Sequence, residues 1–395
     1  MMDLKFVNIK LCLKLFIILK LFIQESNSAS VTLANLNTIC CIDTGTNEIT
    51  NINDALPYCT AIATFSGNDQ TTQNDITILR GNLPYVYIYD NQGHSKMKKS
   101  IKPKHVSKFV NELVSLINDD KIDVMIFDHF APESYWSRKN KDSFQDHLVD
   151  FFTKLKSNFP DKLFGLFLPK EEKYLKKGFD VSVIDNVVDV YLVKSIGYKK
   201  CKKRFPIRHT HQEDMRTVDP SNNLDFTLKM LMTLGYDLKK CLLDIRVIVN
   251  TVNWWHSNTK NDISYSNLCS HDPSSKRSKY CSEILNGFYE KGQLISKYKM
   301  AGAFIQSIDR DDHNCSCTCG LFPATQCISA GLKGLVAPSL VKCIAWGLPP
   351  KDRGNIPSDD DSSVDDDSTT SDSGPPPDLT PAAGQPGGDP ADSSE

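Results

Sequence analysis

The chain has 395 residues with 46 basic and 48 acidic side chains, and its formal net charge of −2 gives no reason to expect nucleic-acid binding. It is longer than a simple β-sandwich requires. Beyond the N-terminus, no segment has the run of about 20 apolar residues that a membrane span needs.

The N-terminus has the pattern of a secretion signal. Lys5 and Lys10 are followed by the apolar run Leu11–Ile23 and then by small residues around Ser28 and Ser30. We therefore predict a signal peptide over residues 1–28 and a secreted, extracellular protein. A signal anchor is the alternative, but the apolar run is short and two lysines interrupt it.

Strand and helix patterns alternate between residues 31 and 347, which predicts an α/β fold. Eight short apolar runs form the strands of a (β/α)8 TIM barrel. The predicted strands are Ile39–Asp43, Cys59–Phe65, Leu83–Asp90, Asp123–Phe130, Lys162–Leu168, Val187–Lys194, Cys241–Val249 and Met300–Ile308. The clearest helices cover 102–118, 143–159 and 223–234. The first two connections are only about a dozen residues long, so we expect a degenerate barrel on that side.

The cysteines suggest an oxidised protein. Twelve of the 13 remain after removal of the signal peptide, an even number for which disulfides are expected. The alternating Cys315, Cys317 and Cys319 would suit a thiolate metal site or separate disulfides, and export favours disulfides. Their candidate partners are Cys269, Cys281, Cys327 and Cys343. We predict no cofactor and no metal.

Residues 348–395 form an acidic tail rich in Pro, Ser and Gly. This composition cannot bury enough apolar area to fold, so we predict disorder. Residues 29–353 contain 42 basic and 35 acidic side chains, a formal charge of +7. Either the tail is a solvated linker, or the basic body binds anionic glycans or surfaces. We expect a monomer.

The fourth predicted strand carries a degenerate motif. Within Ile122–Pro132, the chain resembles the D-x-x-D-x-D-x-E signature of family 18 glycoside hydrolases, the chitinases and chitinase-like lectins. Asp123 and Asp128 match the first and third Asp, whereas Ile126 replaces the second and Phe130 replaces the catalytic Glu. In that family the Glu protonates the glycosidic oxygen, and the Asp two residues before it holds the substrate's N-acetyl group. Because a phenyl ring donates no proton, the resemblance implies that no catalytic residue remains.

The resemblance continues along the chain and loses further functional residues. Ala301–Asp312 looks like the family's eighth strand, GGVMxWxxDxDD, with Gln306 in place of the tryptophan that forms the floor of the sugar site. A carboxamide cannot supply aromatic stacking. The family's sixth strand carries M-x-Y-D, and Lys194 to Gly197 stand there instead.

The resemblance also implies that Cys59 pairs with Cys40 or Cys41, and that the insertion between strands seven and eight is reduced. The complete set of predicted disulfide cysteines is Cys40, Cys41, Cys59, Cys269, Cys281 and Cys315.

The remaining candidates for substrate binding are Asp128, Trp254, Trp255 and Gln306. Asp128 with Asp123 would be either an acid/base or metal pair, or an internally bonded relic of the ancestral strand. The two tryptophans either stack on sugars at the rim or pack under the insertion.

Two loop segments leave further alternatives. His209–Asp214 contains metal-ligand residue types, for which solvated side chains are the alternative. The run Lys199–Arg204 either binds anionic glycans or is a plain charged surface.

Together these features predict a secreted, catalytically inactive chitinase-like protein with a glycan-binding, decoy or signalling role. Its partner would be a carbohydrate, chitin-like or anionic, or a protein receptor. The alternatives are a glycoside hydrolase with a residual or displaced acid, and a protein-binding scaffold without a glycan site.

Overall fold

The computed structural model describes residues 31–42, 52–66, 80–90, 93–128, 141–169, 172–195, 224–251, 264–270, 280–281, 283 and 285–336. Contacts divide the chain into two units, Met1–Gly354 and Asn355–Glu395, and every described residue lies in the first. The predicted signal peptide and acidic tail lie outside the described residues.

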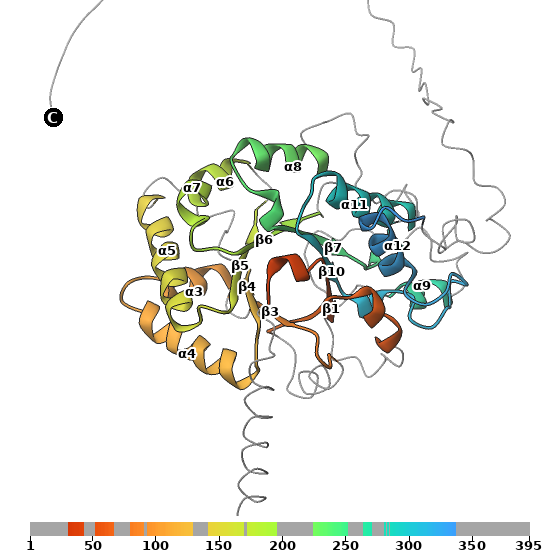
Figure 1. Ribbon diagram of the computed structural model, residues 1–395, viewed down its shortest axis with the longest axis horizontal. Helices are drawn as coiled ribbons and strands as arrows, with labels where there is room; N and C mark the ends of the chain where they lie inside the picture. Colours follow the sequence, from red (N-terminus) through yellow and green to blue (C-terminus); the bar gives the residue numbers. More distant parts are fainter. Residues whose placement is uncertain are drawn as a thin grey trace, which may run out of the picture. The chain divides into compact units, whose positions relative to one another are not determined.

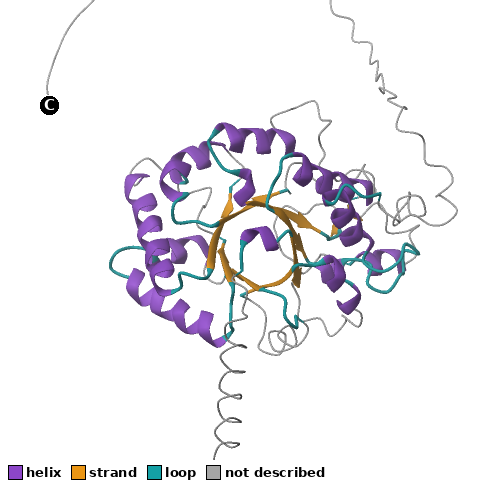
Figure 2. Ribbon diagram, in the orientation of Figure 1, coloured by secondary structure: helices purple, strands orange, loops and turns teal. Residues whose placement is uncertain are grey.

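Eight parallel strands close into a barrel in the order β1, β10, β7, β6, β5, β4, β3, β2. Figure 2 shows the closed ring that the strands form. The strands are β1 (Thr38–Ile42), β2 (Ala61–Phe65), β3 (Tyr85–Tyr89), β4 (Val124–Phe127), β5 (Leu163–Leu168), β6 (Val190–Lys194), β7 (Cys241–Arg246) and β10 (Gly302–Gln306). Seven of them lie within the predicted runs and β1 begins one residue earlier, at Thr38, so the predicted TIM barrel is confirmed.

Helices surround this ring (Figure 1). They are α3 (Gly93–Ser100), α4 (Val106–Asp119), α5 (Lys141–Asn158), α6 (Glu172–Gly178), α7 (Val181–Ile184), α8 (Leu224–Thr233), α9 (Tyr265–Ser270), α11 (Leu285–Lys297) and α12 (Pro323–Leu332). In the described part of the chain, none of them is both long and apolar enough to cross a membrane.

The apolar pattern explains why α4 packs on the barrel. Val106, Phe109, Val110, Leu113 and Ile117 are all buried on one side of this helix. The helix begins later than the predicted residue 102, because Pro103 disfavours helical geometry in the residue before it.

The first connection departs from the β/α repeat. Between β1 and β2, the described residues form two short 3-10 helices, η2 (Ile52–Asp54) and η3 (Leu56–Tyr58). In its described residues 52–60 the first connection contains no α-helix, in agreement with the irregularity predicted for this side. Residues 43–51 and 67–79 of the first two connections lie outside the described residues.

The barrel has two apolar layers. Alternate strand residues such as Cys41, Ile126, Leu192 and Phe304 fill the interior, with Leu36 among them. The opposite faces of the strands pack against the helices, as Phe127 does against Phe151 with ring centroids 5.1 Å apart. This alternation fixes which strand residues point toward the barrel axis.

The segment between β7 and β10 contains a two-stranded antiparallel sheet, β8 (Asn250–Thr251) with β9 (Tyr280–Cys281), besides α9 and α11. Helix α11 lies against α12 at the positions of two glycines. A Cβ on Gly292 would stand 2.3 Å from the carbonyl oxygen of Ile328, and one on Gly331 would stand 2.2 Å from that of Tyr289. Only glycine permits this approach of the two backbones.

Candidate functional site at the barrel mouth

Active sites of TIM barrels lie at the carboxyl ends of the strands, so we first placed the fourth-strand motif there. Ile126 belongs to the interior cluster and is fully buried, while Phe127 faces the helices. Alternation therefore gives Asp128, which follows β4, the inward direction of Ile126. The position of the family's second Asp is an apolar core residue in this barrel.

Asp123 belongs to a different environment. Its carboxylate accepts hydrogen bonds from the backbone N–H of Tyr85 (2.9 Å) and from Lys162 Nζ (3.0 Å). It precedes β4 whereas Asp128 follows it, so the two lie about 16 Å apart along the chain. Asp123 holds neighbouring strands together, and the structure does not bring the two carboxylates into one acid/base or metal pair.

Asp128 is paired with a lysine from the sixth strand. Lys194 Nζ lies 3.5 and 3.4 Å from the two carboxylate oxygens of Asp128. The same ammonium stands 5.0 Å from the ring centroid of Phe167, an interior residue of β5. In the family, according to the resemblance, this carboxylate holds an N-acetyl group; here a cation of the chain itself occupies it.

The seventh strand adds two charged residues that the sequence analysis did not select. Asp244 pairs in register with Lys194 of β6, and Arg246 pairs with Gln306 of β10. Both share the inward parity of Leu242. Polar residues at a spacing of two in an otherwise apolar strand were the signal that could have identified them.

Gln306 takes part in this arrangement as an acceptor. It is 6% exposed, and its Oε1 accepts a 2.8 Å hydrogen bond from Arg246 Nε. The residue that the resemblance aligns with the sugar-stacking tryptophan thus accepts a hydrogen bond from a guanidinium.

Asp244 is the most unusual group at the mouth. It is 1% exposed, and its Oδ1 has no hydrogen-bond partner among the described residues. Burial raises the pKa of this carboxyl to about 6, against the opposing attraction of Arg246 and Lys194. Asp128, Lys194, Asp244, Arg246 and Gln306 together form what we call the mouth cluster.

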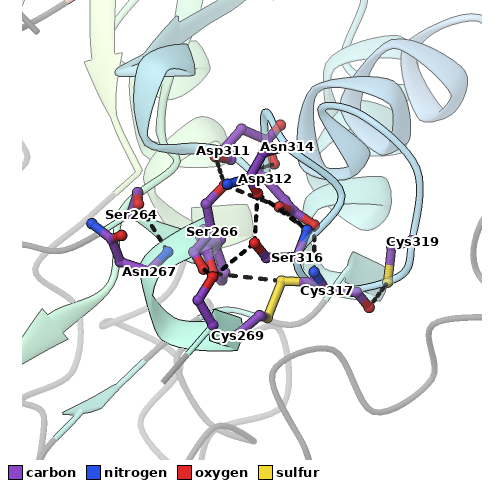
Figure 3. The surroundings of a disulfide bond; sticks show 12 residues. Ser264, Ser266, Asn267, Cys269, Asp311, Asp312, Asn314, Ser316, Cys317 and Cys319 are labelled. Carbon is purple, nitrogen blue, oxygen red and sulfur yellow. Dashed lines mark hydrogen bonds between the residues drawn. A yellow bond between two sulfur atoms is a disulfide. The ribbon is translucent and has the colours of Figure 1, made fainter. Parts of the chain in front are cut away.

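The three aspartates after β10, Asp309, Asp311 and Asp312, have a structural role instead. They lie between the end of β10 and the start of α12, a segment that we call the β10–α12 corner. Asp312 accepts hydrogen bonds from the backbone N–H of Ser316 (2.9 Å) and Cys317 (2.8 Å) and from Ser266 Oγ (3.0 Å), as Figure 3 shows. Asp311 accepts from Thr325, through both the backbone N–H and Oγ1, at 2.9 Å each. Asp309 is buried as well.

Two disulfides are described. Cys40 bonds Cys59, which selects Cys40 from the two candidates, while Cys41 is a buried thiol in the barrel interior. Register explains the choice, because Cys40 faces the outer layer with Cys59 and Cys41 faces inward.

Cys269 bonds Cys317 and joins α9 to the corner (Figure 3). The prediction that Cys315 forms a disulfide is wrong, because Cys315 is an exposed thiol and its neighbours Cys317 and Cys319 are the bonded members of the run. The side chain of Cys281 lies outside the described residues.

Several predicted site residues also lie outside the described residues: Phe130, Ile196, Gly197, Lys199–Arg204, His209–Asp214, Trp254 and Trp255. In the part of the chain that is described, no group of three or more His, Cys, Asp or Glu side chains is arranged to hold a metal ion.

Comparisons with known proteins agree with this geometry at the level of fold. No protein-family model matches the sequence, and no curated protein matches it. Among solved structures, catalytic domain 2 of the Group II chitinase of Ostrinia furnacalis is 15% identical, with 77% of this chain and 98% of that chain covered and a TM-score of 0.59.

Two further structures extend the range of this likeness. Human YKL-39, described as a pseudo-chitinase with retained chitooligosaccharide binding properties, is 12% identical over 75% of this chain and all 100% of that one (TM-score 0.58). A GH18 chitinase of Cycas revoluta is 10% identical over 75% and 99% of the two chains, with a TM-score of 0.58. The barrel therefore has the fold of family 18 chitinases, and the resemblance found in the sequence is confirmed in the fold.

Proposed function

We propose that this protein is a secreted chitinase-like protein that binds glycans, as a decoy or signalling molecule, and does not hydrolyse them. The observation that carries the proposal is the Asp128–Lys194 pair at the barrel mouth. A substrate's N-acetyl group would have to displace this lysine before it could reach the carboxylate.

The fourth-strand motif supports the absence of hydrolysis. Ile126 stands where the family has an Asp, and the sequence has Phe130 where the family has its general acid. General acid catalysis contributes on the order of 10²–10⁴ in rate, so its loss removes useful turnover. YKL-39, with the same fold, is described as a pseudo-chitinase that retains chitooligosaccharide binding, which supports binding without cleavage.

One observation favours a second candidate, a hydrolase with a displaced acid. Asp244 lies at the mouth with a pKa raised to about 6, and a carboxyl with such a pKa can serve as a general acid near neutrality. Its 1% exposure argues against contact with a glycosidic oxygen. The internal pairing of the other four cluster members equally suits a scaffold that binds a protein and has no glycan site.

An activity assay separates these functions. We expect the purified protein to release nothing above blank from soluble chitin oligomers and from a fluorogenic chitobioside. A turnover that disappears in Asp244→Asn would establish the displaced acid, and one that disappears in Asp128→Asn would show that the ancestral site still works; either result overturns the proposal.

Binding is tested separately on a glycan array and with chitin beads. Retention of the wild-type protein on a neutral or anionic glycan supports the proposal. The absence of binding to every glycan, together with an inactive protein, would favour the protein-binding scaffold.

A further inference from the structure

A basic surface lies on α3 and the beginning of α4, outside the barrel mouth. Between Asp90 and Glu112 the sequence contains no carboxylate. The lysines of this interval are Lys96, Lys98, Lys99, Lys102, Lys104 and Lys108. We call this group the α3–α4 basic surface.

The local fold directs most of these charges outward. Met97, Ile101 and Val106 are at most 1% exposed and anchor the segment to the outer core layer. The lysines between these anchors, except the half-buried Lys98, are exposed. The apolar residues thus fix the backbone while the ammonium groups stay in water.

The carboxylate contact of Lys108 neutralises little of the charge of that lysine. Lys108 lies 3.9 Å from Glu112, with side chains that are 84% and 56% exposed. A pair at that distance and exposure contributes little free energy, so the lysine remains available to an external anion.

A cavity opens within the surface. It has a volume of about 180 Å³ and is lined by Lys99, Ser100, His105, Lys108, Phe109 and Glu112. The lining residues carry two ammonium groups, a hydroxyl and an imidazole, against one carboxylate. The hollow has the size and charge to take a sulfate or carboxylate group.

We propose that the α3–α4 basic surface binds an anionic polysaccharide, with one of its sulfate or carboxylate groups in the cavity and the neighbouring ones on the exposed lysines. Charge complementarity along an extended polyanion supports this partner. The disulfides suit an oxidising compartment, in which nucleic acid is not the expected polyanion.

A membrane surface fits less well. Amphipathic segments that lie on bilayers insert large apolar side chains. The large exposed apolar side chains in the described part of the chain are Val183, Phe226, Met232, Leu335 and Val336, and none belongs to α3 or α4. This inference rests on the glycan binding of the proposed function and names the class of glycan, while the surface itself uses no residue of the mouth cluster.

The test is chromatography of the full chain on immobilised heparin, with a salt gradient. The test variant is Lys99→Gln/Lys102→Gln/Lys108→Gln, and the matched control is Lys176→Gln/Lys239→Gln/Lys333→Gln, which removes the same charge from exposed lysines elsewhere. Three exposed contacts, each worth a factor of about two to three in affinity, predict a loss of about tenfold in the test variant at ~0.1 M salt. We expect the control to elute with the wild-type protein, and both variants to unfold at the wild-type temperature.

Four outcomes would overturn the proposal. In the first, the wild-type protein is not retained on heparin at about 0.15 M salt. In the second, the test and control variants lose equal retention, and in the third, retention disappears only when Lys199–Arg204 is neutralised. In the fourth, the protein binds vesicles of anionic phospholipid more strongly than heparin, and this binding depends on Lys99. Retention on chitin beads, measured alongside, reports on the proposed function, and the test variant should leave it unchanged.

Discussion

Two buried carboxylates, Asp244 at the barrel mouth and Asp311 at the β10–α12 corner, have the same burial but opposite surroundings. They are 1% and 0% exposed, and burial raises the pKa of each to about 6. Asp311 accepts hydrogen bonds from Thr325 and from the backbone N–H of Asp312, whereas Asp244 Oδ1 has no partner among the described residues. Since buried polar groups are normally satisfied, Asp311 supports the fold and Asp244 destabilises it.

The same contrast holds for the two regions around them. At the corner, the family's carboxylates are present and bind backbone N–H groups, which fix α12 and the loop through Cys317. At the mouth, Ile126 and Gln306 stand at the positions that the resemblance gives to a polar and an aromatic residue, and Lys194 pairs with Asp128. The corner carboxylates thus hold the barrel together, whereas the mouth positions that the resemblance assigns to sugar binding carry an apolar residue or side chains paired within the chain.

The largest expected effect concerns the disulfide of the corner. Cys269 and Cys317 are separated by 48 residues, for which the chain-entropy treatment gives about 4 kcal/mol of stabilisation. Cys269→Ser/Cys317→Ser should therefore lower the free energy of unfolding by about that amount in a urea titration. Cys315→Ser, which alters an exposed thiol in the same loop, is the control and should change it by less than about 0.5 kcal/mol.

A second effect follows from the hydrogen bonds of Asp311. Asp311→Ala leaves the buried donors of Thr325 unsatisfied and should destabilise the protein by about 3 kcal/mol. The control is Asp180→Ala at the exposed start of α7, where the carboxylate accepts from Ser182 and its loss should cost about 1 kcal/mol. Equal losses in the two variants would mean that the corner contributes no more than an ordinary helix cap.

Replacement of Asp244 should increase the stability of the protein, whereas the two preceding replacements should lower it. A carboxyl whose pKa rises from 3.8 to about 6 on folding is favourable when protonated, so the wild-type protein loses stability as the pH increases from about 4 through 6. Asp244→Asn removes this loss, and its stability relative to the wild-type protein should increase by roughly 1–3 kcal/mol between pH 4 and pH 7. Thermal unfolding across this pH range measures the difference, and parallel pH profiles would contradict the assignment.

The sequence predicted the barrel because its apolar strand patterns alternate with helical ones, and the strand positions follow from local pattern alone. It located Asp128 and Gln306 through the motif, but it did not predict that Lys194 and Arg246 would bind them. Those contacts join different strands, and side-chain pairing between distant segments depends on barrel register, which local periodicity does not encode. The choice of Cys40 over Cys41 required the same register.

The smallest expected effect on stability concerns the Asp128–Lys194 pair at the barrel mouth. The side chains of Lys194 and Asp128 are 36% and 18% exposed, so solvent screens their attraction and Asp128→Asn should cost less than about 1 kcal/mol of stability. A double-mutant cycle with Lys194→Met gives the coupling free energy, which should diminish in 1 M salt because the Debye length there is about 3 Å. A coupling above about 2 kcal/mol would place this pair with the structural carboxylates of the corner.

The same pair also bears on ligand binding. If Lys194 only blocks an otherwise competent N-acetyl site at Asp128, Lys194→Met alone should strengthen binding to chitooligosaccharides. Unchanged binding would mean that the ligand of the mouth does not use Asp128.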